Sequence, residues 1–470
     1  MNKFIFFIVA TLLVPSLSNA NDGLQAGAGT ADITPDIWPI SLVGSFSPRG
    51  AESAHDPLHV RAIALKNGDG QAAIAIVDIL GLSRELLQVA KDRAAQKTGW
   101  LPEQMLVAAT HTHTAPNANA ENPAGQAFRE KLTTGITEAL TQAIENLQPA
   151  AAGWGADSLP DEVRNRRWFL EPGTMPPNPF GELDKVKMNP NKNHIVKPAG
   201  PVDPEVAVLD IRLRNRNQPL ALLANYALHY IGGTGGNVVS ADYFGEFARI
   251  MPARLGTSKI ADNFVAMLSN GTSGDINNID FDGTRAPRAP FEQINLVAGK
   301  VADAAWRATK DLSYHADAPV AVVQRDVTLK RRIPTQEQID WANDTLAVPE
   351  SKTDALPKRA TNYAGRVLNL ARQNPEVDVL IQAVRIGDQA IVSLPFEVLV
   401  EIGLELKEKS PFKNTFVIEL ANGSYGYLPT PHQHDLGGYE TWLGTCNVEK
   451  DSSEILTQNL LEMLEELHGQ

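Results

Sequence analysis

Short apolar runs bounded by turn-forming residues alternate along the chain with segments whose apolar positions recur every three or four residues. Residues 60–65 and 72–80 are predominantly apolar, and the sequence between them, Lys66-Asn67-Gly68-Asp69-Gly70, is typical of a hairpin turn. A segment with a helical period follows at 84–97, and a short apolar run follows it at 105–107. This order predicts a β-hairpin, a helix and a buried third strand.

A later part of the chain repeats this order. Residues 381–386 and 390–394 match the hairpin, 398–409 match the helix, and 415–420 match the third strand. We therefore predict an α/β fold of mixed, stacked β-sheets flanked by helices, in which two structurally related halves form one catalytic domain. Because ligands bind at the carboxyl ends of strands in such sheets, we expect both halves to face a shared site.

Other segments extend the α/β pattern. The apolar stripe of residues 128–147 predicts a second helix. Three further apolar runs predict strands: 206–213, 220–227 and 264–268. The helical pattern of 335–373 predicts a surface insertion. Residues 171–201 contain seven prolines and little periodicity, which predicts a long irregular loop of the kind that lines a pocket mouth.

The composition is that of a globular protein, because 43% of the 470 residues are hydrophobic and 21% are charged. Residues 1–20 combine Lys3, an apolar run and the small-residue ending Ser18-Asn19-Ala20. These features predict a signal peptide over 1–20 and a secreted or periplasmic protein, with an uncleaved anchor as the alternative. No other stretch of the sequence is long and apolar enough to predict a transmembrane helix.

The charge excludes one class of partner. The formal net charge is −13, and removal of residues 1–20, which contain one Lys and no acidic residue, gives −13 − 1 = −14. A protein this acidic has no electrostatic basis for binding nucleic acid. Cys446 is the only cysteine, so the chain forms no internal disulfide.

The most informative polar motif follows the predicted strand at 105–107. Side chains two residues apart point to the same face of an extended chain, so His111 and His113 would project together from the strand end. The pair could bind a metal, or supply one ligand and one proton acceptor, and neighbouring threonines could bond the second ring nitrogens. The alternative is a polar loop with two incidental histidines.

Two other histidines are weaker candidates. His55 lies in a polar segment that Pro57 keeps from being helical, so we retain it as a substrate-pocket candidate only. His229 follows the predicted strand at 220–227 and precedes two glycines, a context in which a structural loop residue is the alternative.

The order of the motifs resembles that of the neutral/alkaline (non-lysosomal) ceramidase family. The matching motifs are His111-Thr112-His113, His229, Gly274-Asp275-Ile276-Asn277, Pro395-Phe396-Glu397, Gly426-Tyr427-Leu428-Pro429-Thr430 and Tyr439-Glu440, with Asn165-Arg166 and 200–205 as further similarities. The resemblance spans 21–470 and corresponds to the family's amino-terminal catalytic domain. We expect a single domain without the carboxy-terminal immunoglobulin-like domain that longer members carry.

The resemblance implies one zinc ion per chain and a set of site residues. The implied zinc ligands are His111, His229, Glu397 and Tyr427. The implied general base is His113, and Tyr439 would donate to the developing oxyanion. Asn165 and Arg166 would join His55 in binding substrate. A satisfied core tyrosine is the alternative for Tyr427.

One position departs from the family pattern. Asn277 stands where ceramidases carry a serine. An asparagine is no nucleophile, but its amide can donate a hydrogen bond to an oxyanion. A mechanism based on metal and water tolerates this change, whereas a serine acyl-enzyme does not.

We therefore predict a secreted zinc-dependent hydrolase that cleaves an N-acyl amide of an acylated small molecule or lipid. The alternatives are a zinc-dependent esterase or deacylase acting on a soluble acylated substrate, and a non-catalytic ligand-binding homologue. A metal phosphatase would require more bridging aspartates than the motifs provide. The departure at Asn277 favours a soluble acyl compound over long-chain ceramide.

Overall fold

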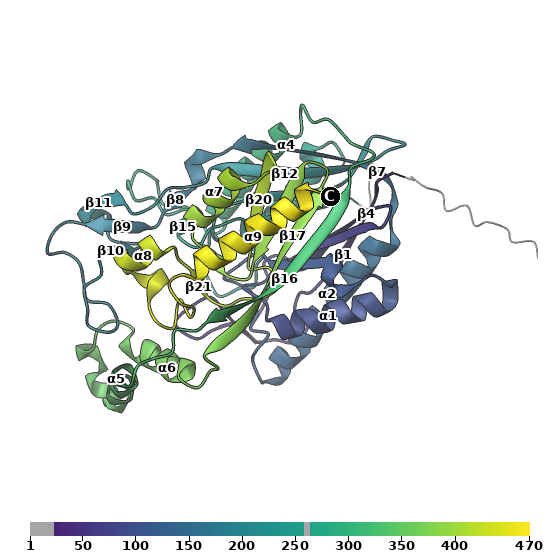
Figure 1. Ribbon diagram of the computed structural model, residues 1–470. Helices are drawn as coiled ribbons and strands as arrows, with labels where there is room; N and C mark the ends of the chain where they lie inside the picture. The colour runs from purple at the N-terminus through teal and green to yellow at the C-terminus, as the bar shows by residue number, and fades with distance from the viewer. Residues whose placement is uncertain (1–22, 258–263) are drawn as a thin grey trace, which may run out of the picture.

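Two stacked β-sheets form the centre of the molecule, and helices cover their outer faces (Figure 1). The computed structural model describes residues 23–257 and 264–470, so the predicted signal peptide lies outside the described residues. The arrangement confirms the predicted mixed α/β fold with stacked sheets flanked by helices. Within the described ranges, no helix has the length and apolar character needed to cross a membrane.

The larger sheet has eight strands in the order β14-β13-β12-β7-β1-β4-β5-β6. Their bounds are β1 (Gln25–Asp32), β4 (His59–Asn67), β5 (Gly70–Val77), β6 (Met105–Ala109), β7 (Gln148–Ser158), β12 (Glu205–Leu213), β13 (Gln218–Tyr226) and β14 (Val265–Asn270). β5 pairs with β6 in parallel, as β13 does with β14, and the other neighbours are antiparallel.

The smaller sheet has four strands in the order β16-β17-β18-β20. Their bounds are β16 (Val320–Lys330), β17 (Glu376–Ile386), β18 (Gln389–Leu394) and β20 (Asn414–Glu419). Apolar side chains of both sheets form one buried cluster, in which Ile74 and Leu209 of the larger sheet join Ile386 and Phe416 of the smaller sheet. Burial of this apolar surface, worth about 25 cal/mol per Å², holds the two layers together.

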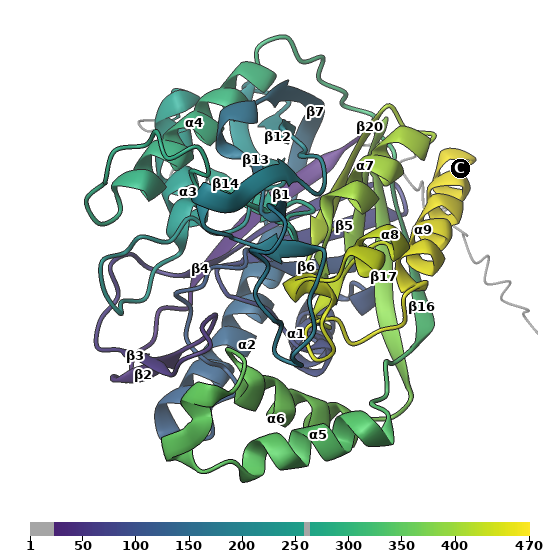
Figure 2. The same cartoon turned by 90° about the vertical axis from the view of Figure 1, so that its left-hand side faces the viewer.

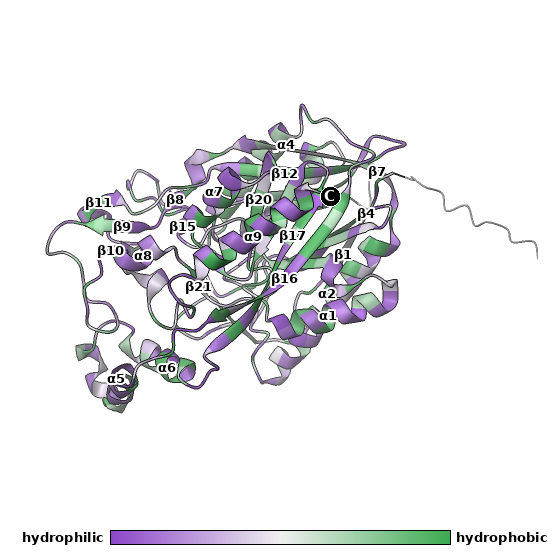
Figure 3. Ribbon diagram, in the orientation of Figure 1, coloured by the Kyte–Doolittle hydropathy of each residue, from purple (hydrophilic) through white to green (hydrophobic). Residues whose placement is uncertain are grey.

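Six long helices cover the outer faces of the two sheets (Figure 2). They are α1 (Arg84–Thr98), α2 (Pro123–Glu145), α3 (Asp242–Arg254), α4 (Glu292–Ala308), α7 (Val400–Lys409) and α9 (Ser452–His468). Figure 3 shows hydrophilic and hydrophobic residues along α1, α2 and α9, as expected for helices with one face in solvent. Gly27 allows α2 to lie against β1, because a Cβ there would come within 2.2 Å of the Ala143 carbonyl oxygen.

The hairpin–helix–strand unit occurs three times in the structure. Each unit is an antiparallel pair followed by a helix and a parallel third strand: β4-β5-α1-β6, β12-β13-α3-β14 and β17-β18-α7-β20. The first and third units are those predicted from the sequence. Because the same pairing also occurs in the middle of the chain, the division into two related halves stays a prediction.

The segment 171–201, predicted as a long irregular loop, contains the short strands β10 (Val186–Met188) and β11 (Ile195–Pro198), so that prediction is wrong in part. β9 (Arg167–Leu170) pairs on its two sides with β10 and β11, and β8 (Arg164–Asn165) pairs with β15 (Ile276–Asn277). Strands of two to four residues show no measurable period in the sequence, and the prolines between them hid the pairing.

The remaining elements are short or peripheral. The predicted insertion at 335–373 holds α5 (Gln336–Ala347) and α6 (Ala360–Leu370), which pack on each other away from the sheets (Figure 2). The other short strands and helix are β2 (Ile40–Leu42), β3 (Arg49–Ala51), β19 (Glu397–Val398), β21 (Tyr427–Leu428) and α8 (Pro431–Leu436). The 3-10 turns are η1 (Pro102–Gln104), η2 (Pro160–Glu162), η3 (Lys192–His194), η4 (Glu350–Ala355) and η5 (Tyr439–Thr441).

Candidate metal centre

Strand ends from both sheets meet beside the histidine motif. The edge strands β6 and β20 are joined where they end, because the Ala109 N–H donates to the Leu420 carbonyl at 3.1 Å and the Asn422 N–H donates to the Val107 carbonyl at 2.8 Å. His111 lies two residues beyond the end of β6. His229 lies three residues beyond the end of β13, which is next to the edge strand β14 in the larger sheet.

Three imidazoles converge at this place. His111 Nε2 lies 3.1 Å from His113 Nε2 and 3.2 Å from His229 Nε2. His111 and His229 are buried and His113 is half-buried. These three histidines form a group that could bind a metal ion.

The backbone brings the His-x-His pair together differently from the prediction. The chain at 110–113 is not a strand, and His111 adopts a left-handed conformation with φ 69°. Backbone bonds hold this turn, because the His111 N–H donates to the Ile79 carbonyl at 2.9 Å. The threonines do not bond the ring nitrogens either: Thr112 and Thr114 donate to the Ser240 carbonyl instead.

Backbone carbonyls fix the tautomer of all three rings. The Nδ1 atom of His111 lies 2.7 Å from the Leu80 oxygen, that of His113 lies 2.8 Å from the Gly44 oxygen, and that of His229 lies 3.1 Å from the Ser273 oxygen. A carbonyl only accepts hydrogen bonds, so each Nδ1 carries the proton. In the neutral rings, three Nε2 lone pairs then face one another, an arrangement that a cation at their centre would stabilise.

A carboxylate completes the group. Glu397 Oε2 lies 3.2 Å from His111 Nε2 and 3.7 Å from His229 Nε2. While the three rings are neutral, no described residue donates a hydrogen bond to this buried oxygen. Because buried polar atoms are nearly always paired, the unsatisfied oxygen and the three lone pairs fit a metal with nitrogen and oxygen ligands.

The electrostatics keep two of the rings neutral. Burial lowers the pKa of His113 and His229 well below the ordinary value, and the adjacent His111 lowers both further. Burial also lowers the pKa of His111, but Glu397 reverses this effect and the pKa is raised. On the carboxylate, burial raises the pKa and His111 lowers it, so the pKa of Glu397 is lowered overall and the group is ionised at neutral pH.

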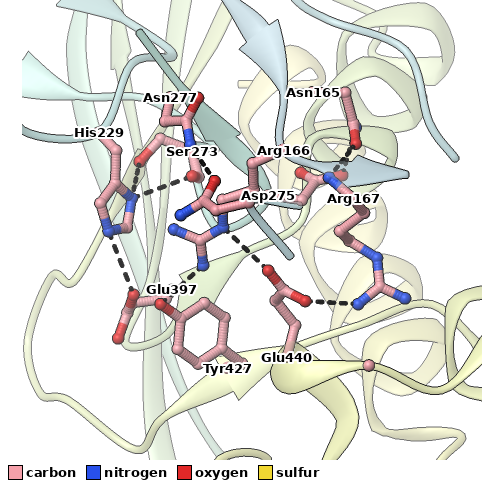
Figure 4. Close-up of polar contacts among 12 residues, drawn as sticks. Asn165, Arg166, Arg167, His229, Ser273, Asp275, Asn277, Glu397, Tyr427 and Glu440 are labelled. Atoms are coloured by element: carbon pink, nitrogen blue, oxygen red, sulfur yellow. Dashed lines mark hydrogen bonds and ion pairs between the residues drawn. The ribbon is translucent and has the colours of Figure 1, made fainter. Parts of the chain in front are cut away.

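Two short strands place Tyr427 next to this carboxylate. β19 pairs with β21 in parallel, with Glu397 opposite Tyr427. Arg166 Nη2 donates to the Tyr427 hydroxyl at 2.9 Å (Figure 4). Burial raises the pKa of Tyr427 well above its ordinary value, although Arg166 lowers it. The structure thus brings the predicted ligand Tyr427 to the edge of the group.

A buried ion network that the sequence did not reveal supports Arg166. Arg166 Nε donates to Glu440 Oε1 at 2.9 Å, and Arg167 Nη1 donates to Glu440 Oε2 at 2.5 Å (Figure 4). Arg167 Nε also donates to Gln433 Oε1 at 3.0 Å. The paired arginines and the Tyr439-Glu440 motif were visible in the sequence, but nothing in their spacing indicated that they meet.

A cavity of about 610 Å³ opens at the histidine group. It is lined by six of the predicted site residues: His113, Arg166, His229, Asn277, Tyr427 and Tyr439. Asn277 Nδ2 donates to Asn189 Oδ1 at 2.5 Å, which leaves the second N–H of the amide for a ligand. His111 and Glu397 line a second cavity of about 260 Å³, so the group lies between the two cavities.

Two predicted substrate-binding residues lie elsewhere. Asn165 donates to Asp275 Oδ2 at 2.8 Å and to the Pro201 carbonyl at 3.1 Å, so it anchors the loop that leads to Asn277. His55 stacks on Phe291 with ring centroids 3.5 Å apart and lines a separate cavity of about 310 Å³. The structure does not bring either side chain to the cavity at the histidine group.

Three residues that support the site escaped the sequence analysis. Gly44 places its carbonyl against His113; its φ is 83°, and a Cβ there would meet the His113 ring at 2.7 Å. Ser273 bonds His229 and also donates to the fully buried Glu419 at 2.7 Å. The Tyr230 ring stacks on His113 at 3.7 Å between centroids. Of the three, only Ser273 lies in a segment with a local signal in the sequence, the polar loop after β14.

The comparisons with known proteins support the family resemblance of the motifs. The family model described as neutral/alkaline non-lysosomal ceramidase, N-terminal, matches residues 24–284. The search of curated proteins finds no match.

Two solved structures share the fold. The crystal structure of neutral ceramidase from Pseudomonas aeruginosa superposes with a TM-score of 0.70 at 16% identity over 94% of this chain and 74% of that chain. A structure described as ceramidase complexed with C2 gives 0.71 at 15% identity over 95% and 75% of the two chains. The family model covers more than half of this chain, and the chain is therefore a hydrolase of the neutral/alkaline non-lysosomal ceramidase family.

Proposed function

We propose that this protein is a secreted, zinc-dependent amidohydrolase that cleaves the N-acyl bond of an acylated small molecule or lipid. The observation that carries the proposal is the meeting of three Nε2 lone pairs with an unsatisfied oxygen of Glu397. Proposed ligands to one zinc ion are His111, His229, Glu397 and Tyr427. When bound, zinc supplies a Lewis acid and lowers the pKa of water towards neutrality.

The chain's own groups supply the remaining functions. His113 presents an unprotonated Nε2 at the cavity, and the Gly44 carbonyl and the Tyr230 ring hold its orientation. It is the proposed proton acceptor. Tyr439 and Asn277 line the same cavity, and the hydroxyl of the first and the free amide N–H of the second would donate to an oxyanion that develops on the acyl carbonyl.

Arg166 acts through Tyr427 rather than on the substrate carbonyl. Its guanidinium is held by Glu440 and donates to the phenol oxygen, so it orients Tyr427 towards Glu397. Hydrogen bonds from neighbouring residues commonly fix the orientation of metal-binding side chains. We propose Arg166 as a positioning residue that also lines the substrate cavity.

Ceramide is the substrate class that the family implies, and an ester or amide of a soluble acylated compound is the second candidate. Asn277 favours the second candidate, because it replaces the family serine at the cavity wall. The comparison of kcat/KM for a short-chain soluble N-acyl amide and for long-chain ceramide, at constant detergent, separates the two. A clear preference for long-chain ceramide would contradict the soluble substrate.

Metal analysis of the purified protein tests the zinc assignment. We expect about one zinc per chain in the unaltered protein, and loss of the metal together with amide hydrolysis in His111→Ala and His229→Ala. His194→Ala is the matched control, because that histidine is half-exposed and pairs with Glu171 away from the group. Full zinc occupancy in both site variants would refute the assignment.

A further inference from the structure

Arg359 is a cation at the cavity mouth for which the structure provides no anionic partner. It directly precedes α6 and lines the 610 Å³ cavity together with Phe46 and Tyr439. Its guanidinium carbon lies 3.8 Å from the centre of the Phe46 ring. Among residues 23–257 and 264–470, no group accepts a hydrogen bond or forms an ion pair with this guanidinium. Five N–H donors are thus available at the cavity.

The backbone of Arg359 is held in an unfavourable conformation. Its φ is 70°, in the left-handed region that a side chain with a Cβ rarely adopts. Non-glycine residues in this region persist where the surrounding structure determines them, and they concentrate at binding sites. The stacking on Phe46 and the left-handed turn therefore fix the direction of the guanidinium before any ligand arrives.

The other cations that line the cavity are already compensated. Arg166 pairs with the buried carboxylate of Glu440. The Arg285 guanidinium lies 4.0 Å from the buried carboxylate of Glu162 and donates to the Asn278 carbonyl at 2.8 Å. Asp280 is the one carboxylate that lines this cavity. Arg359 is therefore the cation of the lining that remains for a ligand.

Two lysines add positive charge beside Arg359. Lys358 is its neighbour in the chain, and Lys187 lies on β10. Burial lowers the pKa of Lys187, and the positive charges of Arg359 and Lys358 lower it further. Asp184 offsets part of this effect. This local excess of positive charge occurs in a chain whose formal net charge is −13.

We propose that the natural substrate carries an anionic oxygen group that Arg359 binds at the cavity mouth while the acyl amide lies at the histidine group. This inference rests on the proposed amidohydrolase function of the same cavity. A guanidinium matches a carboxylate or a sulfonate through two parallel N–H bonds, and such charge-assisted bonds are among the strongest in proteins. The substrate class is therefore an acyl amide of an amino acid, or of another amine that bears an acid group.

Three soluble substrates of similar size test the inference. N-hexanoylglycine carries a carboxylate, N-hexanoyltaurine carries a sulfonate, and N-hexanoylethanolamine is neutral. For the unaltered protein we expect kcat/KM for an anionic substrate to exceed that for the neutral one by about tenfold, because solvent at a partly exposed site reduces the gain from the two charge-assisted bonds. The substrate that gives the larger ratio identifies the preferred anion. The ratio should fall as NaCl is raised from about 0.05 to 0.5 M.

Substitutions of Arg359 test whether this residue causes the preference for anionic substrates. Arg359→Gln should bring the ratio of anionic to neutral kcat/KM close to one, and Arg359→Lys should retain part of the preference. Arg372→Gln is the matched control, because it removes the same charge from an exposed arginine just beyond α6. This variant should keep the full ratio of anionic to neutral kcat/KM. A ratio near one in the unaltered protein, or a ratio unchanged in Arg359→Gln, would overturn the inference.

Calorimetric binding separates failure of this inference from failure of the proposed function. If none of the amides is hydrolysed but N-hexanoylglycine binds the unaltered protein and binds Arg359→Gln at least about tenfold more weakly, the anion site stands and the proposed hydrolysis fails. If the two proteins bind it equally, the anion site is refuted, whatever the rate of hydrolysis. Urea unfolding of each variant verifies that it is folded.

Discussion

Replacement of Glu440 by Gln should destabilise the protein strongly although it changes neither size nor shape. The carboxylate is fully buried and accepts hydrogen bonds from Arg166 and Arg167, whose side chains are 5% and 0% exposed. Glutamine removes the negative charge, and its amide NH2 faces one of the two guanidiniums. Two buried cations would then lose their common counterion.

The size of the effect follows from this geometry. Removal of one partner of a buried ion pair costs about 3–5 kcal/mol of unfolding free energy. Arg167 keeps Gln433 as a neutral acceptor, which favours the lower end of this range. Without the predicted signal peptide the chain has 470 − 20 = 450 residues. At about 2.1 cal/mol/K per residue, its unfolding entropy is roughly 0.95 kcal/mol/K, so Tm should fall by about 3–5 °C.

Thermal and urea unfolding at pH 7 measure this loss. Glu466→Gln is the matched control, since its pair with Arg325 is about half exposed and its loss should shift Tm by less than about 1 °C. Burial raises the pKa of Glu440, but Arg167 and Arg166 outweigh it and the pKa is lowered below 4.5. The stability that ionised Glu440 contributes is therefore complete above pH 4.5 and is lost as pH falls through the folded-state pKa. Equal unfolding midpoints for Glu440→Gln and the unaltered protein at pH 7 would refute the reasoning.

Three further predictions concern the site and the core. His113→Ala should keep its zinc yet lose about 10²-fold or more in turnover, and loss of the metal, measured by elemental analysis, would make His113 a ligand instead. Asn277→Ala should retain metal and lower kcat about 10²-fold in the same assay, and unchanged kcat would exclude the amide as an oxyanion donor. Burial lowers the pKa of Lys91 from 10.5 to about 7, so the unfolded chain binds the proton more tightly and stability should rise between pH 7 and 10.5. Urea unfolding of Lys91→Met should show no such rise, and an unchanged rise would contradict this assignment.

The sequence predicted the elements whose period is long enough to recognise. The stripe that starts at Phe128 became α2, and the two hairpins became β4-β5 and β17-β18 at nearly the predicted bounds. α2 buries one face along its length, and the hairpin strands form continuous buried apolar runs, so each pattern can be recognised locally. The short strands β8 to β11 were missed because each buries too few residues to produce a pattern.

The structure brings several of the predicted site residues together, but it holds them in a way that the sequence did not indicate, and their roles stay a prediction. His111, His113 and His229 meet as the ordered motifs indicated, with Glu397 beside them. The groups that orient the rings are backbone carbonyls, which every residue carries, so no residue type in the sequence marks them. The geometry also does not distinguish the proposed ligand His229 from the proposed base His113. Their Nε2 atoms lie at nearly the same distance from His111 Nε2, 3.2 Å and 3.1 Å.

The left-handed conformation of His111 is unfavourable by itself, so the surrounding fold must hold it in place. A non-glycine residue in that region costs about 1–2 kcal/mol, and burial of three lone pairs around an unpaired carboxylate adds to that cost. The backbone bond from the His111 N–H to the Ile79 carbonyl and the bond from His111 Nδ1 to the Leu80 carbonyl offset the strain without involving the Nε2 atom. The conformation is therefore imposed by the strand ends, and the Nε2 atoms are left with no partner except one another and Glu397. A cation bound between these atoms would satisfy them together, so the strand ends prepare a group that could bind a metal ion.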